Sequence, residues 1–560
     1  MTVAEYIIEH LINIGVTDLF GIPGGVVLDF LYAAEARKPI ITPHLTYHEQ
    51  TAGFAACGYA QSSGKLGVAY ATKGPGFTNL LTPMADAYYD SVPVLFITSH
   101  SAAPSPKGIR TMTDQEMDTC DVVRSFTKYA VRIDTIEDVV PQVSKACLAA
   151  IGGRKGPVFV DVNTKLWNEP LPVGSFRAVA TEEMLDMSMD DTISQIRAAK
   201  RPVILIGDGI NQADARNDFR ELSKKLNLPI VSSRFTHDIV GYMPNYYGYV
   251  GSHGIRCANF ILSKADLIIA LGNRLNFPVH SPSYEPIVKQ AKIIRYEIDE
   301  TELLRDIPNS QPYVTDIQHL IKKLVTNNYD FGDHSEWMRT CDYLYEELKN
   351  EDCPDVVLSL ASLLHHISEE SILVTDIGNN EFWVSRACVL NRQKNRTLYS
   401  KSFCALGNGL GKAIGAYYAT RKPVVCFIGD QGLQMNIQEL QFISQHQLPI
   451  AIVVLNNKTS GMIKDRELAT GHTTPLHTTS DSGYLAPDLD KLANAYGIQY
   501  LHFRELPENK TVLSKIASLL LIELPVDPNL SLSPSLPKQN VCQNLTPYLD
   551  SEKYNYLDQL

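Results

Sequence analysis

Short apolar runs recur along this chain, and amphipathic stretches with helical spacing separate them. A run that is apolar throughout, instead of alternating with polar residues, is typical of a strand buried on both faces of a sheet. Strands that alternate with helices form parallel sheets, so the expected fold class is α/β with doubly wound parallel sheets. The predicted buried strands are residues 67–71, 92–98, 158–162, 203–207, 268–272, 424–428 and 450–455.

The 560 residues are too many for one core, and two stretches with little apolar periodicity divide them. These predicted linkers are residues 163–181 and 327–354, the second being acidic and aromatic around an expected helix. The domains that they separate are predicted at 1–170, 185–330 and 355–525, with a C-terminal tail at 526–560. We expect the tail to lie over a surface, with a subunit boundary as one place for it. Glycine-rich turns at similar places in the first and third domains suggest a duplicated architecture.

The composition excludes several classes of protein. Apolar residues make up 44% of the chain and charged residues 20%, as in an ordinary soluble globular protein. With a net charge of −12 and no basic cluster, the chain is not expected to bind nucleic acid. It begins without a signal-peptide pattern and has no apolar run of bilayer length, so we expect a cytoplasmic protein without membrane contact. Its ten cysteines lack a C-x-x-C pair and are expected to be reduced structural thiols.

A glycine turn in the third domain is a candidate phosphate site. The predicted strand 424–428 runs directly into Gly-Asp-Gln-Gly (429–432), which opens a helical segment and offers backbone N–H groups to an anion. Asp430 is the hard oxygen ligand available there for a divalent cation, with magnesium expected. The next strand ends in Asn456-Asn457, which one strand–helix–strand unit would bring to the same sheet edge. The turn alone is common, but the turn together with the paired asparagines is far more specific.

A second candidate region lies in the first domain, where three turns or helix starts each follow a short apolar run. They are DLFGIPGG (18–25), HEQTA (48–52) and KGPGFTN (73–79). By itself, Glu49 in the second block is a first-turn acid that stabilises a helix N-terminus, an effect of a few tenths to about 1 kcal/mol. The order and spacing of the three blocks favour a functional role instead.

At these blocks the chain resembles the thiamine-diphosphate-dependent enzymes, and in particular the large catalytic subunit of acetolactate synthase. The family motif begins Gly-Asp-Gly and ends Asn-Asn at the spacing of residues 429–457, and the resemblance extends through ADA (85–87), SVP (91–93) and GPV (156–158). It implies pyrimidine-binding, middle and diphosphate-binding domains. Because the family places one cofactor between two subunits, it also implies at least a homodimer, with a tetramer as the larger alternative.

The resemblance assigns roles residue by residue. Glu49 hydrogen-bonds the aminopyrimidine ring and favours the imino tautomer that removes the proton from thiazolium C2. Asp430, the Asn457 side chain and the Thr459 carbonyl hold magnesium. Leu406 stands at the position of the apolar wedge beneath the bent cofactor, with ordinary core packing as its alternative. Further cofactor contacts are expected at Gly74, Asn380, Gly429, Gln431, Gly432, Gly461 and Met462, although Gln431 stands where the family usually has glycine.

The implied reaction is the loss of carbon dioxide from a 2-oxo acid such as pyruvate, followed by transfer of the two-carbon unit to a carbonyl acceptor. Catalytic roles fall to Glu49, Leu406, Gly25 and Gln115. Substrate contacts are expected at Val26, Lys128 and Arg466. For Gln115 the alternative is an exposed residue at a helix start.

Two departures from acetolactate synthase concern the substrate pocket. The family's Gln-His is Asn379-Asn380 here, and the tryptophan that shapes its acceptor pocket falls at Arg466, close to Lys464. A basic, polar wall favours oxygen-rich or anionic acceptors over a second small oxo acid. Acetyl transfer to a keto sugar, simple decarboxylation and a catalytically silent cofactor-binding relative therefore stay as alternatives.

The middle domain also resembles that of acetolactate synthase, which carries an FAD that the redox balance does not need. The expected FAD contacts are His253, Gly254, Gly272, Arg274 and Glu297. Glu297 follows a predicted strand, where a carboxylate can hold a ribose hydroxyl. The alternative is a middle domain that keeps these turns for packing without any flavin, with His253 a structural histidine.

Overall fold

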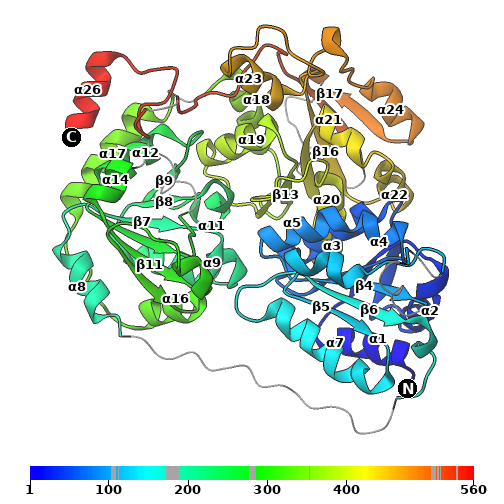
Figure 1. Ribbon diagram of the computed structural model, residues 1–560. Coiled ribbons are helices and arrows are strands. Elements are labelled where there is room, and N and C mark those ends of the chain that lie inside the picture. Colours follow the sequence, from blue (N-terminus) through cyan, green and yellow to red (C-terminus); the bar gives the residue numbers. More distant parts are fainter. Residues whose placement is uncertain are drawn as a thin grey trace. The chain divides into compact units, whose positions relative to one another are not determined.

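The computed structural model describes residues 1–101, 109–110, 113–171, 188–275, 285–351, 353–505, 513, 516, 519–537 and 540–560. The chain forms two compact units. Unit 1 comprises Met1–Thr181, Glu370–Glu381 and Thr397–Pro528, and unit 2 comprises Glu182–Glu369, Phe382–Arg396 and Asn529–Leu560. Three six-stranded parallel sheets carry the fold, two in unit 1 and one in unit 2 (Figure 1).

The first sheet of unit 1 has the strand order β2-β1-β3-β4-β6-β5. Its interior strand β4 is buried at all seven positions, as a strand covered on both faces requires. The strands are β1 (Asp18–Gly21), β2 (Thr42–Leu45), β3 (Gly67–Tyr70), β4 (Val94–His100), β5 (Tyr129–Ile133) and β6 (Val158–Asn163). The helices are α1 (Val3–Asn13), α2 (Leu28–Glu35), α3 (Glu49–Ser63), α4 (Pro75–Asn79), α5 (Leu81–Tyr89), α6 (Thr119–Val123) and α7 (Ile136–Ile151).

The second sheet of unit 1 has the order β14-β13-β15-β16-β18-β17, which is the order of the first sheet with new strands. The duplicated architecture suggested by the glycine turns is therefore confirmed. The strands are β13 (Ile372–Thr375), β14 (Thr397–Leu398), β15 (Val424–Gly429), β16 (Ile450–Asn456), β17 (Gln499–His502) and β18 (Leu520–Pro525). The helices are α20 (Gly409–Thr420), α21 (Asp430–Met435), α22 (Glu439–Gln445), α23 (Gly461–Ala469) and α24 (Leu489–Ala495), while α19 (Asn379–Leu390) begins in unit 1 and belongs to unit 2 from Phe382 onward.

Helices α3 and α20, which hold equivalent places in the two halves, lie side by side and join the two sheets of unit 1 (Figure 1). Glycines permit this close crossing. A Cβ on Gly415 would stand 1.8 Å from the Ala55 carbonyl oxygen, and one on Gly58 would stand 2.2 Å from the Lys412 carbonyl oxygen. One apolar core runs through both domains here, with Ala55 and Leu410 fully buried. The start of α3, which carries Glu49, is thereby fixed against the third domain of the same chain.

The sheet of unit 2 has the order β12-β11-β10-β7-β8-β9, in which the strand order reverses between β7 and β10. The strands are β7 (Pro202–Ile206), β8 (Ile230–Ser232), β9 (Tyr246–Tyr249), β10 (Leu267–Leu271), β11 (Lys292–Glu297) and β12 (Ser310–Val314). The helices are α8 (Asp190–Ala198), α9 (Gly209–Gln212), α10 (Arg216–Lys225), α11 (His237–Val240), α12 (Arg256–Lys264), α14 (Glu285–Gln290), α15 (Glu300–Leu303), α16 (Ile317–Thr326), α17 (Ser335–Leu348) and α18 (Asp355–Leu364). Helix α17 lies in a predicted linker but packs into the core, where the Trp337 indole donates to the Pro202 carbonyl at 3.1 Å.

The C-terminal tail lies over the middle domain within unit 2 and ends in α26 (Ser551–Gln559). Buried polar side chains of α12 hold its backbone. The Arg256 guanidinium donates to the carbonyls of Leu545 and Pro547, each at 3.0 Å, and the Asn259 amide donates to the Cys542 carbonyl at 2.9 Å. Because these bonds use backbone carbonyls, the tail needs few periodic apolar residues to stay in place.

The seven predicted interior strands are confirmed as β3, β4, β6, β7, β10, β15 and β16, with ends shifted by up to two residues. The expected α/β class with parallel sheets is therefore correct. Across the described ranges, no helix is long and apolar enough to cross a membrane. All ten cysteines lie in the described part of the chain and are free thiols.

Candidate cofactor site

The strand order of the third domain reverses between β13 and β15, and ligands of doubly wound sheets bind at such a point, beyond the carboxyl ends of the strands. Asn380 bridges these two strand ends. Its amide donates to the Asp376 carbonyl at 2.8 Å and to the Phe427 carbonyl at 3.4 Å. A Cβ on Gly429 would stand 3.9 Å from the Asn380 side-chain oxygen, so the predicted contacts Asn380 and Gly429 lie together at this reversal point.

Asp430 begins α21 directly after β15 and is 1% exposed. Its Oδ2 accepts a hydrogen bond of 2.7 Å from the Tyr484 hydroxyl. Burial raises the pKa of Asp430 to about 6, and the bond from Tyr484 offsets this only in part. A divalent cation would favour the ionised form of this carboxyl, so the residue suits the predicted metal-ligand role.

Asn457 and Thr459 follow β16 at the same edge of the sheet. Asn457 Oδ1 accepts from the Thr459 N–H at 3.2 Å, and a Cβ on Gly461 would lie 2.7 Å from Asn457 Nδ2 and 3.1 Å from Asn379 Nδ2. Thr459 Oγ1 and Asn379 Oδ1 are buried and find no hydrogen-bond partner within the described part of the chain. Buried polar atoms without partners are costly, so this edge fits a polar group such as a metal-bound diphosphate.

Asp376, just beyond β13, organises the turn that carries Leu406. Its two oxygens accept from the N–H groups of Gly407 at 3.0 Å and Gly409 at 2.7 Å. Burial raises the pKa of Asp376 to about 6, which these N–H groups partly offset. A Cβ on Gly432 would come within 2.9 Å of Asp376 Oδ1. The requirement for a small residue therefore falls at Gly432, while Gln431 occupies the half-buried position before it.

Glu49 is the first residue of α3 and is 9% exposed. The Asn79 amide donates to Glu49 Oε2 at 2.9 Å, and a Cβ on Gly76 would stand 3.2 Å from Oε1. A solvated first-turn acid would need neither a half-buried amide partner nor a glycine turn pressed against it. The observed surroundings therefore favour a functional carboxylate at this position.

The turn after β3 also meets Gln115. Gly74 has a φ of +64°, and a Cβ there would lie 2.6 Å from Gln115 Cβ. The Gln115 side chain is exposed in the single chain. The structure thus brings Gly74, Gln115 and the Glu49 region together around one turn.

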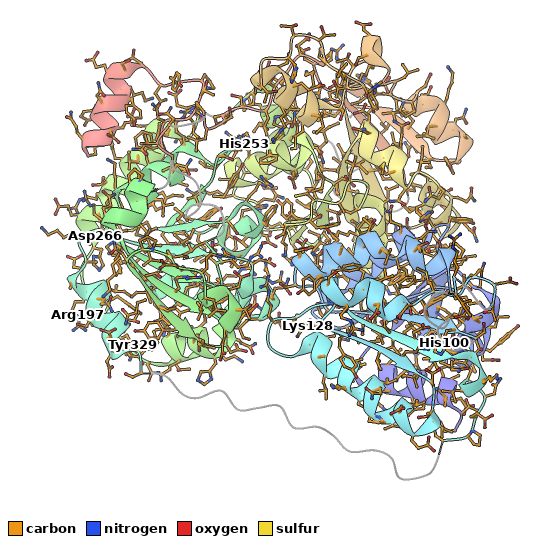
Figure 2. The ribbon with its side chains drawn as sticks, in the orientation of Figure 1. His100, Lys128, Arg197, His253, Asp266 and Tyr329 are labelled. Atoms are coloured by element: carbon orange, nitrogen blue, oxygen red, sulfur yellow. The ribbon has the colours of Figure 1, made fainter. Side chains whose placement is uncertain are left out.

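The remaining predicted substrate residues of the first domain lie at two different edges of its sheet. Gly25 and Val26 follow β1 at the carboxyl edge of the sheet, where the Val26 carbonyl accepts from the Trp167 indole at 3.0 Å. Lys128 stands directly before β5, at the opposite edge from His100, which ends β4 (Figure 2). Its ammonium donates to the Gly152 carbonyl at 2.7 Å. One chain therefore does not bring Lys128 together with the other candidates.

The predicted acceptor wall on α23 is only partly basic. Arg466 is exposed, but the Lys464 ammonium is buried and bonded to the Pro528 carbonyl. Between them, Asp465 accepts a hydrogen bond of 3.1 Å from the Asn379 amide. Met462, beside Gly461, is half-buried. The wall thus carries one exposed cation and a carboxylate that faces the site.

The flavin candidates of the middle domain already have partners in unit 2. His253 Nδ1 lies 3.2 Å from the Pro534 carbonyl oxygen, and its ring stands edge-on to Phe382. Arg274 pairs with Glu302 at 3.6 Å, and Glu297 accepts from the N–H of Ile298. Gly254 and Gly272 allow backbone segments to approach: a Cβ on Gly272 would stand 2.7 Å from Gly209 Cα, and one on Gly254 would stand 2.7 Å from the Gly251 nitrogen. These contacts suit packing, and the flavin stays a prediction.

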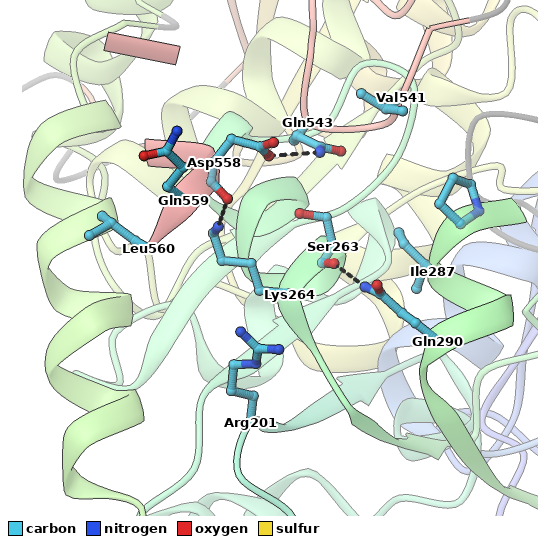
Figure 3. Close-up of a pocket in the computed structure, with 11 residues that line it drawn as sticks. Arg201, Ser263, Lys264, Ile287, Gln290, Val541, Gln543, Asp558, Gln559 and Leu560 are labelled. Atoms are coloured by element: carbon cyan, nitrogen blue, oxygen red, sulfur yellow. Dashed lines mark hydrogen bonds between the residues drawn. The ribbon is translucent and has the colours of Figure 1, made fainter. Parts of the chain in front are cut away.

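A cavity of about 280 Å³ lies in unit 2 beneath α26, and none of the predicted site residues line it (Figure 3). There the Lys264 ammonium donates to the Asp558 carbonyl at 2.8 Å, and the Gln543 amide donates to the Asp558 carboxylate at 3.1 Å. The cavity therefore marks where the last helix of the chain is held.

Several residues that support the site escaped the sequence analysis. Asp376, Asp465 and Tyr484 bond directly to predicted site residues or their turns. Glu439 also belongs to this group, since its Oε1 accepts from the Tyr47 N–H near the start of α3, and burial raises its pKa to about 7. Perturbed carboxyl groups around one sheet edge are a signal of a functional site, but burial has to be known before the signal appears.

Comparison with known proteins agrees with this geometry. Three family models match the chain: "Thiamine pyrophosphate enzyme, N-terminal TPP binding domain" at residues 1–122, the central domain of that enzyme at 189–324 and its C-terminal TPP binding domain at 376–520. Thiamine pyrophosphate is thiamine diphosphate. Within the described ranges, no group of three or more His, Cys, Asp or Glu residues could hold a metal ion.

Similar proteins are named as acetolactate synthase subunits. The large subunit of Lactococcus lactis subsp. lactis is 30% identical over 95% of this chain and 94% of its own length. The isozyme 1 large subunit of Escherichia coli K12 is 34% identical over 83% of each chain. The probable large subunit of Methanococcus aeolicus is 30% identical over 95% of this chain and 93% of its own. This chain is therefore a thiamine-pyrophosphate-dependent enzyme and belongs to the family whose N-terminal, central and C-terminal domains it carries in that order.

Proposed function

We propose that the enzyme removes carbon dioxide from a 2-oxo acid, with pyruvate as the first candidate, and transfers the remaining two-carbon unit to a carbonyl acceptor. The observation that carries this proposal is that unit 1 holds two groups of candidate cofactor residues, one in each of its domains. Glu49 stands at one helix start, and Asp430, Asn457 and Thr459 gather at one sheet edge. The similarity to proteins named acetolactate synthases supports the choice of reaction.

Asp430, Asn457 and the Thr459 carbonyl would hold Mg²⁺, and the N–H groups at Gly429 and Gln431 would face the diphosphate. When bound, the cofactor's thiazolium ring supplies the electron sink for the loss of carbon dioxide. Leu406, on the turn that Asp376 holds rigid, would support the bent cofactor.

Glu49 would exchange a proton with the aminopyrimidine ring through Oε1, since the Asn79 amide bonds to the other oxygen, Oε2. The test compares Glu49→Gln with Glu35→Gln, a change at an exposed glutamate of the same domain that pairs with Lys38. Exchange of the cofactor's C2 proton for deuterium, followed by NMR, should slow by about 10²- to 10⁴-fold in Glu49→Gln only. Cofactor binding, measured by calorimetry, should persist in both. Equal exchange rates in the two variants would remove Glu49 from this role.

A second candidate is transfer of the acetyl unit to an oxygen-rich acceptor such as a keto sugar. The Asn379–Asp465 pair and the exposed Arg466 favour it, because they offer hydrogen bonds and charge where an apolar wall would select a small oxo acid. Purified enzyme is given pyruvate alone, pyruvate with 2-oxobutyrate, and pyruvate with keto sugars, and the products are identified by mass spectrometry. Acetolactate from pyruvate alone supports the first candidate, and a branched sugar supports the second. Acetaldehyde as the sole product in all three reactions contradicts both.

Three further parts of the proposal have direct measurements. Sedimentation velocity should give at least a dimer, as the family arrangement requires. An absorption band near 450 nm would show that FAD copurifies with the protein. The contacts of His253 and Arg274 favour a middle domain that uses its turns for packing, and in that case this flavin band is absent. The cytoplasmic location is tested by cell fractionation.

A further inference from the structure

Gln115 adopts a backbone conformation that costs energy. Its φ of +59° lies in the left-handed region, which residues other than glycine seldom occupy, at a cost of about 1 kcal/mol or more. Such a conformation persists only where the surroundings hold it. On one side the surroundings are the Gly74 turn, which has no room for a Cβ against Gln115.

On the other side, the side chains of Lys73 and Ser101 and the Ser101 N–H hold Glu116, the next residue. The Lys73 ammonium lies 2.5 Å from Ser101 Oγ and 3.7 Å from Glu116 Oε1. The Ser101 hydroxyl and N–H donate to the same Glu116 oxygen at 3.1 and 3.3 Å. The side chains of Lys73 and Glu116 are only 13% and 3% exposed. We name this group the Lys73–Ser101–Glu116 clasp.

The donors of the clasp favour the charged form of Glu116. Burial raises the pKa of Glu116, but the hydrogen bonds from Ser101 and Thr113, together with the nearby Lys73 ammonium, outweigh burial and bring this pKa below its usual range. The carboxylate is therefore charged and depends on these donors. Removing the ammonium from such a buried pair leaves an uncompensated charge, which is far more disruptive than losing an exposed pair.

Lys73 also belongs to the turn that carries Gly74. One short segment therefore contacts Gln115 through its glycine and anchors Glu116 through its lysine. We propose that Lys73 is a positioning residue, which fixes the Gln115 amide where it meets the acceptor and so sets how much of the two-carbon unit is transferred instead of released as aldehyde. This inference rests on the proposed function for its consequence, but the anchoring itself does not.

The first test needs no substrate. Amide hydrogen exchange over residues 113–117 is compared among the wild type, Lys73→Met, Lys73→Arg and Lys38→Met. Lys38 supplies the matched control, since its pair with Glu35 at 2.8 Å is exposed on both sides. We expect exchange at least about tenfold faster in Lys73→Met, near wild-type rates in Lys73→Arg, and no change in Lys38→Met. Equal exchange in Lys73→Met and Lys38→Met overturns the anchoring role.

The second test measures the ratio of carboligation product to aldehyde at saturating pyruvate. In Lys73→Met and in Gln115→Ala this ratio should fall by about tenfold or more. In the double variant it should fall no further, because both changes remove a correctly positioned Gln115 amide. Lys73→Arg should restore the ratio. Multiplicative losses in the double variant overturn the inference. If the wild type forms no carboligation product while Lys73→Met still accelerates exchange at 113–117, the proposed function fails and the anchoring stands.

Discussion

A buried ion pair joins the two domains of unit 1 and should be essential to its stability. Lys412 on α20 has no exposed surface, and its ammonium lies 3.0 Å from Asp86 Oδ2 on α5 and 2.9 Å from the Tyr399 carbonyl oxygen. Asp90, one turn further along, accepts from the N–H groups of Lys401 and Ser402 at 2.7 and 2.8 Å. The substitution Lys412→Met keeps most of the side-chain volume but removes the fully buried charge that balances these carboxylates.

The expected loss follows from this geometry. Removing one partner of a fully buried pair costs about 3–5 kcal/mol, because the remaining charge stays desolvated. For a unit of this size, at about 2.1 cal/mol/K of unfolding entropy per residue, such a loss lowers the midpoint of thermal unfolding by roughly 4–7 °C. Lys38→Met, which removes an exposed pair, should lower the stability by no more than about 0.5 kcal/mol.

The loss should also depend on pH. Burial, and then the neighbouring Asp86, raise the pKa of Asp90 to about 6, against about 3.9 in the unfolded chain. The folded state therefore binds more protons between these values, and stability falls as pH rises through that window. Without the ammonium this pKa rises further, so Lys412→Met should be more destabilising at pH 8 than at pH 5. Scanning calorimetry at both pH values measures this, and a shift under 2 °C, or an equal shift at both pH values, would refute the reasoning.

Three further predictions concern the metal, a glycine and a histidine. Thiamine diphosphate should raise the unfolding midpoint with Mg²⁺ present but not with EDTA, and an equal shift in the two buffers would exclude a metal-bridged diphosphate. Gly432→Ala should lose about 1–3 kcal/mol of stability, since its Cβ would crowd the Asp376 carboxylate. Gly429→Ala, whose nearest neighbour atom would be 3.9 Å away, serves as its control, and similar losses in both would contradict the packing. Burial lowers the pKa of His237 to about 4, so stability should fall as pH drops from about 6.5 toward 4. In His237→Gln, calorimetry should show a weaker dependence of stability on pH. An unchanged dependence would mean that another group causes it.

The interior of each sheet could be read from the sequence because burial on both faces leaves a continuous apolar run. Strands such as β4 and β16 are buried at every position. Short interior strands such as β1 and β13 were not predicted, and neither were the edge strands β2 and β17. β2 and β17 are half-exposed, so their residues are mixed and no periodic pattern marks them. Helix α17, placed in a predicted linker, shows that an acidic, aromatic segment can still bury one face.

The sequence by itself determined the parallel α/β class and the local chemistry of the cofactor turns, because Asp430 and Asn457 follow directly from strands whose order places their ends at one edge. Tertiary structure decided which side chains complete those turns. Tyr484 reaches Asp430 across 54 residues, and Asp465 reaches Asn379 across 86. It also decided that Lys464 serves a backbone carbonyl and that Lys73 anchors Glu116. Hydrogen bonds between distant side chains leave no periodic trace along a chain, because they depend on packing and burial that exist only once the sheets have formed.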